Sequence, residues 1–167
     1  SLPGETGIAY VVIALRDADG QPPIVELLAE ITGLPVEEAR DGMEVLADHV
    51  YVAPTDSLVQ MAEGKFQVEP AGNLEHPRGA IDTFFYSLAE ERQTGAIGIL
   101  LSGNGTDGTL GLKAISDFGG MTVVQDPETA AFNAKPRSGA TLGVADRVLA
   151  PDRILPEILN YSRHLQT

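Results

Sequence analysis

The 167-residue sequence contains no cysteine, no tryptophan and only three histidines. The absence of cysteine excludes disulfides, thiolate metal ligands and a cysteine nucleophile, and it fits a reducing cytoplasm. With so few imidazoles, a metal site would have to be mostly carboxylate. We therefore predict no metal site and no cofactor.

Basic residues are also scarce. Eleven Lys and Arg stand against 24 Asp and Glu, for a net charge of −13. Such a chain repels polyanions, so nucleic acid is a poor partner. The sequence has no apolar run near the length of a membrane span, and residues 1–6 lack the basic and apolar regions of a signal peptide. We expect a soluble, cytoplasmic protein with no membrane insertion.

Two continuous apolar runs, residues 8–15 and 96–101, are typical of strands buried on both faces of a parallel sheet. Amphipathic or capped segments between and after them predict helices over residues 22–32 and 109–118, from Ile81 onward, and from near Pro156. Further strands are expected at residues 50–53, 58–61, 66–68, 121–125 and 146–150, the second and third of these forming a hairpin. Alternating strands and helices predict an α/β fold, a doubly wound, mostly parallel sheet with helices on both faces in three Rossmann-like layers.

The turn after residues 96–101 carries the strongest local signal, because ligands and catalytic groups of such sheets gather at the carboxyl ends of strands. It reads S-G-N-G-T-D-G over residues 102–108, and Asp126 follows at the end of the next expected strand. The glycine spacing is that of a dinucleotide-binding loop, although a carboxylate at Asp107 would oppose a pyrophosphate. Asp107 or Thr106 capping the helix that begins near Thr109, or a catalytic role for Asp107, are the alternatives.

Three longer segments accompany this turn. They read TGIAYVV with HVYVAP, IDTFFYSLAEER with IGILLSGNGTDGTLGLKAI, and GGMTVVQDPETA with PRSGA. In this order they resemble the catalytic domain of the CheB-type chemotaxis protein-glutamate methylesterases, in particular the branch fused to a chemotaxis methyltransferase. The resemblance covers essentially the whole chain, and it implies one domain over residues 1–167 that lacks the family's first βα unit.

The resemblance implies hydrolysis of glutamate γ-methyl esters on methyl-accepting chemotaxis receptors by a Ser, His and Asp triad. Asp107 matches the triad Asp, whereas Leu15 falls on the His position and no G-x-S-x-G-G turn for the nucleophile is present. Family analogy also assigns residues to the substrate cleft: Asn104, which falls where the family often has Met, Gly105, Pro136, Arg137 and His76. Leucine accepts no proton, so we expect the chain as it stands to be inactive.

Three functions remain open on sequence grounds. An active methylesterase would need a nucleophile upstream of Ser1 and another base, for which His76 is the best candidate. A non-catalytic relative would bind receptor, methyltransferase or kinase segments through the old cleft, that is, the substrate cleft of the active family members. Methyltransferase and kinase domains are also candidates for fusion partners. A nucleotide-binding domain is the third. A missing first strand would also leave an apolar edge beside residues 8–15, which we expect a second copy or another segment to cover.

Overall fold

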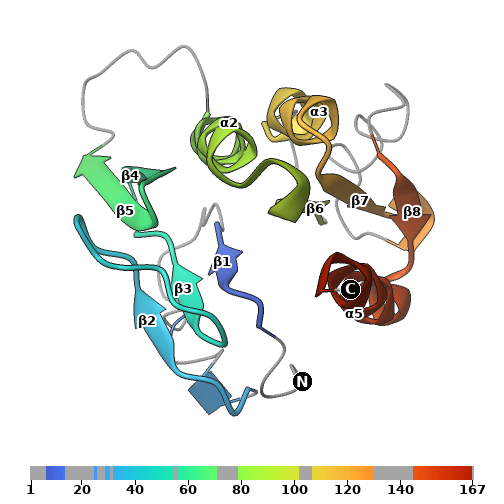
Figure 1. The fold of residues 1–167 in the computed structure, drawn as a ribbon, viewed down its shortest axis with the longest axis horizontal. Coiled ribbons are helices and arrows are strands. Elements are labelled where there is room, and N and C mark those ends of the chain that lie inside the picture. The colour runs from blue at the N-terminus through green and yellow to red at the C-terminus, as the bar shows by residue number, and fades with distance from the viewer. Residues whose placement is uncertain are drawn as a thin grey trace. The chain divides into compact units, whose positions relative to one another are not determined.

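The computed structural model describes residues 7–13, 25, 29–30, 32–54, 56–70, 79–101, 107–129 and 145–166. The chain divides into two compact units, Ser1–Glu75 and His76–Thr167, whose elements are labelled in Figure 1. Each unit has its own small parallel sheet.

The sheet of the first unit has the order β1-β3-β2, with β1 over Tyr10–Val12, β2 over Val36–Glu38 and β3 over Val50–Val52. Both pairings are parallel. The middle strand β3 is buried along its whole length. Its β-branched residues suit a position between two strands, where both faces are covered.

A hairpin completes this unit. β4 (Ser57–Ala62) pairs antiparallel with β5 (Lys65–Pro70) around a turn at Glu63 and Gly64. Phe66 is fully buried, and its ring meets the ring of Tyr51 edge to face, with centroids 5.0 Å apart. The Tyr51 hydroxyl accepts a hydrogen bond from the Leu46 amide at 2.9 Å, which pairs its polar end inside the core.

The second unit contains β6 (Ile97–Leu100), β7 (Met121–Gln125) and β8 (Arg147–Leu149), all parallel, in the order β6-β7-β8. Every residue of β7 is buried. Helix α2 (Ala80–Arg92) packs against α3 (Thr109–Asp117), and α3 packs on β6 and β7. Helix α5 (Pro151–Gln166) packs on β7 from the opposite face of this sheet (Figure 1).

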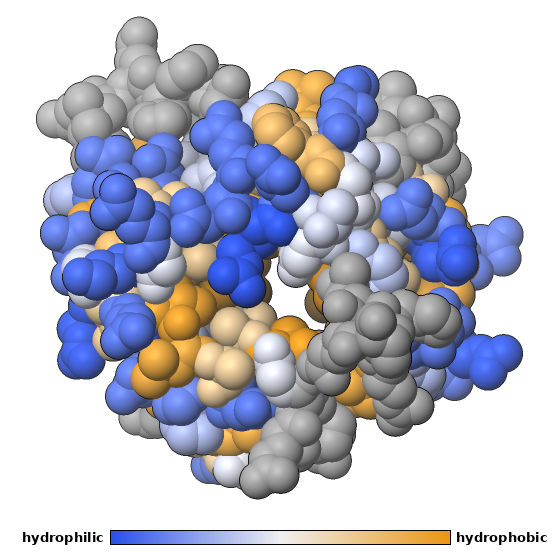
Figure 2. Space-filling view, in the orientation of Figure 1, coloured by the Kyte–Doolittle hydropathy of each residue, from blue (hydrophilic) through white to orange (hydrophobic). Residues whose placement is uncertain are grey.

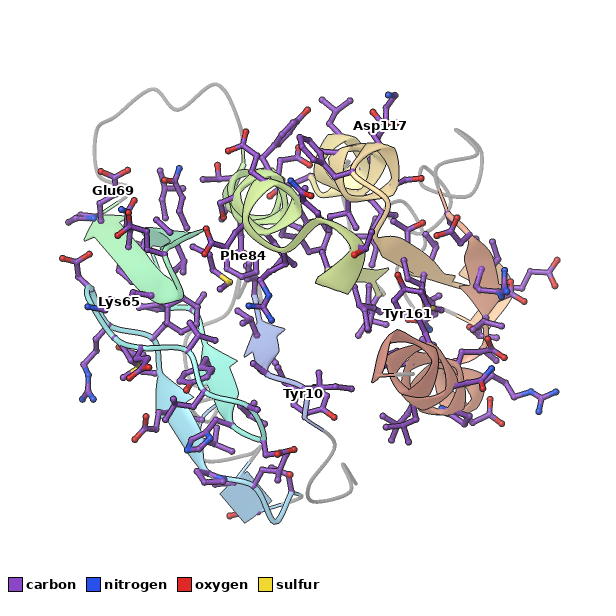
Figure 3. The ribbon with its side chains drawn as sticks, viewed as in Figure 1. Tyr10, Lys65, Glu69, Phe84, Asp117 and Tyr161 are labelled. Atoms are coloured by element: carbon purple, nitrogen blue, oxygen red, sulfur yellow. The ribbon has the colours of Figure 1, made fainter. Side chains whose placement is uncertain are left out.

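Two short 3-10 helices, η1 (Gln93–Gly95) and η2 (Pro127–Thr129), follow α2 and β7. The hydroxyl of Tyr161 on α5, the residue labelled in Figure 3, donates a hydrogen bond to the Thr94 carbonyl of η1 at 2.8 Å. A cavity of about 490 Å³ opens beside Tyr161, between the start of β7, the end of α3 and α5. Its lining includes Met121 and Arg147, the first residues of β7 and β8, so it lies at the amino ends of these two strands.

The predicted parallel α/β organisation and the hairpin are confirmed, β6, β7 and α3 begin and end within a residue or two of the expected positions, and α2 begins within one residue of Ile81. The predicted start of the last helix near Pro156 is wrong, because α5 begins at Pro151. Pro151 occupies the first helical position, where a proline is tolerated because its missing N–H would have no partner inside the helix. Burial of Ile154 and Ile158 on one face stabilises the helix through Pro156.

Strand β2 was not predicted, since the sequence Val36–Glu38 has two acidic residues and one apolar one. Of the helix expected over residues 22–32, the described residues 25, 29 and 30 are helical. Strands β1 and β6 are edge strands of their described sheets. Coverage of the edge beside residues 8–15 by a second copy or another segment stays a prediction. Within the described ranges, no helix is long and apolar enough to cross a bilayer.

Candidate functional site

Asp107 lies in the turn before α3, at the carboxyl end of β6, and its carboxylate is bound by the backbone of a different helix. Its Oδ2 accepts a hydrogen bond from the Ile81 amide at 3.1 Å, and its Oδ1 accepts one from the Asp82 amide at 2.9 Å. These amides belong to the first turn of α2, whose N–H groups have no partner inside the helix. Asp107 therefore caps the amino end of α2.

Asp82 makes the reverse connection. It lies in the first turn of α2 and is 7% exposed. Its Oδ1 accepts hydrogen bonds from the amide of Gly108, the N-cap residue of α3, at 3.0 Å and from the amide of Gly111 in the first turn of α3 at 2.7 Å. The amino end of each helix is thus capped by an aspartate from the opposite segment, and each carboxylate lies at the positive end of a helix dipole. We call these two residues the aspartate pair.

Two glycines give the aspartate pair its space. A Cβ at Gly79, the residue before α2, would overlap the Asp107 carboxyl group. A Cβ at Gly111 would lie 2.6 Å from the Cβ of Phe85 and 3.1 Å from Oδ1 of Asp82. Because glycine has no Cβ, the two helices begin close enough together for each carboxylate to reach backbone amides at the start of the opposite helix.

Burial raises the pKa of Asp82, and the neighbouring carboxyl group of Asp107 raises it further through its charge and a side-chain hydrogen bond. The hydrogen bonds from the Gly111 and Gly108 amides act against this rise. The net direction is upward, so the ionised form of Asp82 is less favourable in the folded protein than in water.

A carboxylate has about four lone-pair positions, and the two backbone amides use two of those on Asp107. The remaining positions could accept a proton donor such as an imidazole N–H, so the geometry is compatible with an orienting carboxylate. In the described part of the chain, no three His, Asp or Glu side chains gather in a way that could hold a metal ion. The group that this site presents is the Asp107 carboxylate, a hydrogen-bond acceptor.

The family model described as CheB methylesterase matches residues 1–158. The chain belongs to this family. A crystal structure of the CheB methylesterase catalytic domain from Thermotoga maritima superposes with a TM-score of 0.82, at 27% identity, covering 94% of this chain and 86% of that one. The predicted Rossmann-like α/β fold is therefore the CheB catalytic-domain fold.

Curated relatives agree. The chain is 36% identical over 165 residues to the "Protein-glutamate methylesterase/protein-glutamine glutaminase 3" of Burkholderia orbicola, which covers 95% of this chain and 47% of that protein. It is 36% identical over 140 residues to an "Uncharacterized 104.1 kDa protein" of Rhodobacter capsulatus, covering 83% of this chain and 14% of that protein. The chain thus spans about half or less of the length of these relatives.

Of the residues that the CheB resemblance assigns to the site, Asp107 is described, and its role in a triad stays a prediction. The other assigned residues lie outside the described residues: Leu15, His76, Asn104, Gly105, Pro136 and Arg137. His49, in the first unit, has its Nδ1 within hydrogen-bond distance of the Ala47 carbonyl, 2.9 Å, and stacks on Tyr51. Ser87 donates its hydroxyl to the Phe84 carbonyl at 2.7 Å.

Of the two residues considered as caps for the helix that begins near Thr109, Asp107 caps α2 instead, and Thr106 lies outside the described residues. The first turn of α3 is capped by Asp82, which sequence reasoning missed because an acidic residue in the first turn of a helix ordinarily serves that same helix. The occupied amides of Gly108 and Gly111 also count against a pyrophosphate at this helix end. Asp126, the other part of the dinucleotide pattern, accepts the Glu128 amide at 3.0 Å and so organises η2.

Proposed function

We propose that this chain is a CheB-family domain of chemotaxis signalling that engages methylated glutamates of chemoreceptors but does not hydrolyse their esters in its present form. The binding of Asp107 by two backbone amides of α2 carries the proposal. It gives the matched triad aspartate a structural role that needs no histidine, so its retention fits a domain without turnover.

The chemistry supports the same conclusion. Hydrolysis by a serine requires an imidazole that removes the hydroxyl proton, while a carboxylate such as Asp107 orients that imidazole and stabilises its charged form. Leu15 occupies the position of the imidazole in the family pattern, and an aliphatic side chain accepts no proton. Loss of an essential triad member lowers turnover by up to roughly six orders of magnitude.

The direct test measures methanol released from methylated receptor by the natural protein that contains this chain. An active family member is measured beside it as the positive control. We expect release at the level of the protein-free control, unchanged by Asp107→Asn. Turnover that Asp107→Asn lowers by about 10⁴-fold, as expected for a working triad aspartate, would overturn the proposal.

Receptor engagement is tested separately, because a domain without turnover can still bind. Titration calorimetry with the cytoplasmic fragment of a receptor should show saturable binding that is stronger for methylated than for unmethylated glutamates. Equal binding of both forms, or none, would contradict receptor engagement through the old cleft. Methyltransferase or kinase segments are the next partners to titrate in that case.

The alternative is an active methylesterase in which another histidine is the base. If methanol is released, His76→Ala should abolish it, whereas His49→Ala should not, since His49 is already bound to a neighbouring carbonyl and stacked on Tyr51. Release that survives both changes would exclude His76 and His49 as the base.

A further inference from the structure

The aspartate pair links two parts of the chain that are far apart in sequence. Four hydrogen bonds of 2.7–3.1 Å connect residues 81–82 with residues 107–111. Asp107, in the turn before α3, accepts two amides of α2, and Asp82 of α2 accepts the amides of Gly108 and Gly111 at the start of α3. Neither carboxylate caps its own helix in these contacts.

From this geometry we infer that Asp82 is a positioning residue for Asp107. Asp82 holds the amides of Gly108 and Gly111, and Gly108 follows Asp107 directly in the chain. Fixing the Gly108 amide to α2 therefore fixes where the Asp107 carboxylate lies. That carboxylate in turn caps the first turn of α2, which contains Asp82 itself.

Burial strengthens the coupling. Asp82 is 7% exposed and Gly108 is buried, so water is a poor substitute for either partner. The close approach depends on glycine at two positions, since a Cβ at Gly79 would overlap the Asp107 carboxyl group and a Cβ at Gly111 would overlap Phe85 of α2. The positioning uses only carboxylate and backbone groups, so it holds whether or not the domain hydrolyses an ester.

Amide hydrogen exchange followed by NMR on the full chain tests this. In Asp82→Ala the amides of Gly108 and Gly111 lose their acceptor directly. The decisive amide is that of Ile81, which binds Asp107 and not Asp82. If Asp82 positions Asp107, exchange at Ile81 should also accelerate, by about fivefold or more, the change expected for one lost helix cap.

The conservative variant provides the rescue. The side-chain oxygen of Asp82→Asn can accept both amides that Oδ1 of Asp82 accepts now, so exchange at Ile81 should return to the wild-type rate. A purely local cap would leave Ile81 unchanged in both variants. The matched control is Asp152→Ala, which removes an exposed first-turn aspartate from α5 and should alter none of these amides.

Gly79→Ala approaches the same link from the other side, because the added methyl displaces the Asp107 carboxyl while both aspartates remain. We expect faster exchange at Ile81 together with faster exchange at Gly108. If Asp82→Ala does not fold, Asp82→Asn and Gly79→Ala decide the matter. Wild-type exchange at Gly108 in Gly79→Ala, or unrescued exchange at Ile81 in Asp82→Asn, would overturn the inference.

Discussion

At the scale of single residues, the candidate site consists of two neighbouring carboxylates, those of Asp82 and Asp107, which cap the amino ends of two helices. Helix ends favour negative charge, whereas burial and a like charge oppose it. For Asp82 the opposing effects prevail, and its pKa is raised above 3.8. Ionised Asp82 therefore accepts hydrogen bonds from the start of α3 and at the same time carries an electrostatic cost.

Asp82→Asn separates these two effects. Because the folded-state pKa of Asp82 is raised, protonation favours the folded protein, and this contribution is full below pH 3.8 and is lost as pH rises through the raised value. Asparagine keeps the oxygen acceptor without the charge. We expect the free energy of unfolding of the variant, relative to wild type, to increase as pH rises through that window.

Urea unfolding at a series of pH values, from below 3.8 to 7, measures this difference. The lowest pH is the internal control, because wild-type Asp82 is then protonated and its charge contributes nothing. A difference that shrinks with rising pH would show that the helix ends stabilise the ionised form more than burial opposes it.

At the scale of elements, helix α3 packs against both α2 and the sheet. Leu112 and Ile115 are fully buried on one side of it, and Leu110 is 57% exposed on the other. A Cβ at Gly98 on β6 would lie 2.6 Å from Cδ1 of Ile115 and 2.9 Å from Cδ1 of Leu112. The helix therefore packs directly on the strand backbone.

Leu112→Ala should leave a cavity that this close packing cannot fill, and we expect a loss of about 2–5 kcal/mol in the free energy of unfolding. Leu110→Ala is the matched control, with the same change two residues away at an exposed position. It should cost no more than about 0.5 kcal/mol. Chemical denaturation of both variants checks this, and equal losses would mean that α3 packs differently.

Elements were the part of this protein most open to prediction. Apolar runs and β-branched residues defined β6 and β7, and the glycines after Phe118 defined the end of α3. The aspartate pair was out of reach, since nothing in residues 79–82 indicates that they lie beside residues 107–111. Pairing between distant segments depends on tertiary packing, and neither propensity nor periodicity encodes it. The turn with Asp107 was singled out by its place after an apolar run, the family resemblance assigned Asp107 its triad role, and its contacts came from the structure.

At the scale of the whole molecule, negative charge dominates. The chain carries a net charge of −13, and hydrophilic residues cover much of the face shown in Figure 2, with apolar residues exposed between them. Among described residues, the large exposed apolar side chains are Leu46, Leu101, Leu110, Phe118 and Val148. A surface of this charge favours cationic or neutral partners.

We accordingly expect no binding of the chain to duplex DNA at about 150 mM salt, where polyanion binding depends on Lys and Arg contacts with phosphates. Fluorescence anisotropy of a labelled duplex measures this, with a basic DNA-binding domain as the positive control. Binding that weakens steeply with added salt would reveal a local basic surface stronger than the overall charge.

The use of Asp107 by the backbone of α2 has a consequence for how related genes are interpreted. Asp107 accepts two first-turn amides of α2, so the fold has a use for this residue that does not depend on hydrolysis. If this chain does not hydrolyse esters, as proposed, an aspartate at this position does not by itself identify a working esterase, and the histidine and serine positions are the ones to inspect.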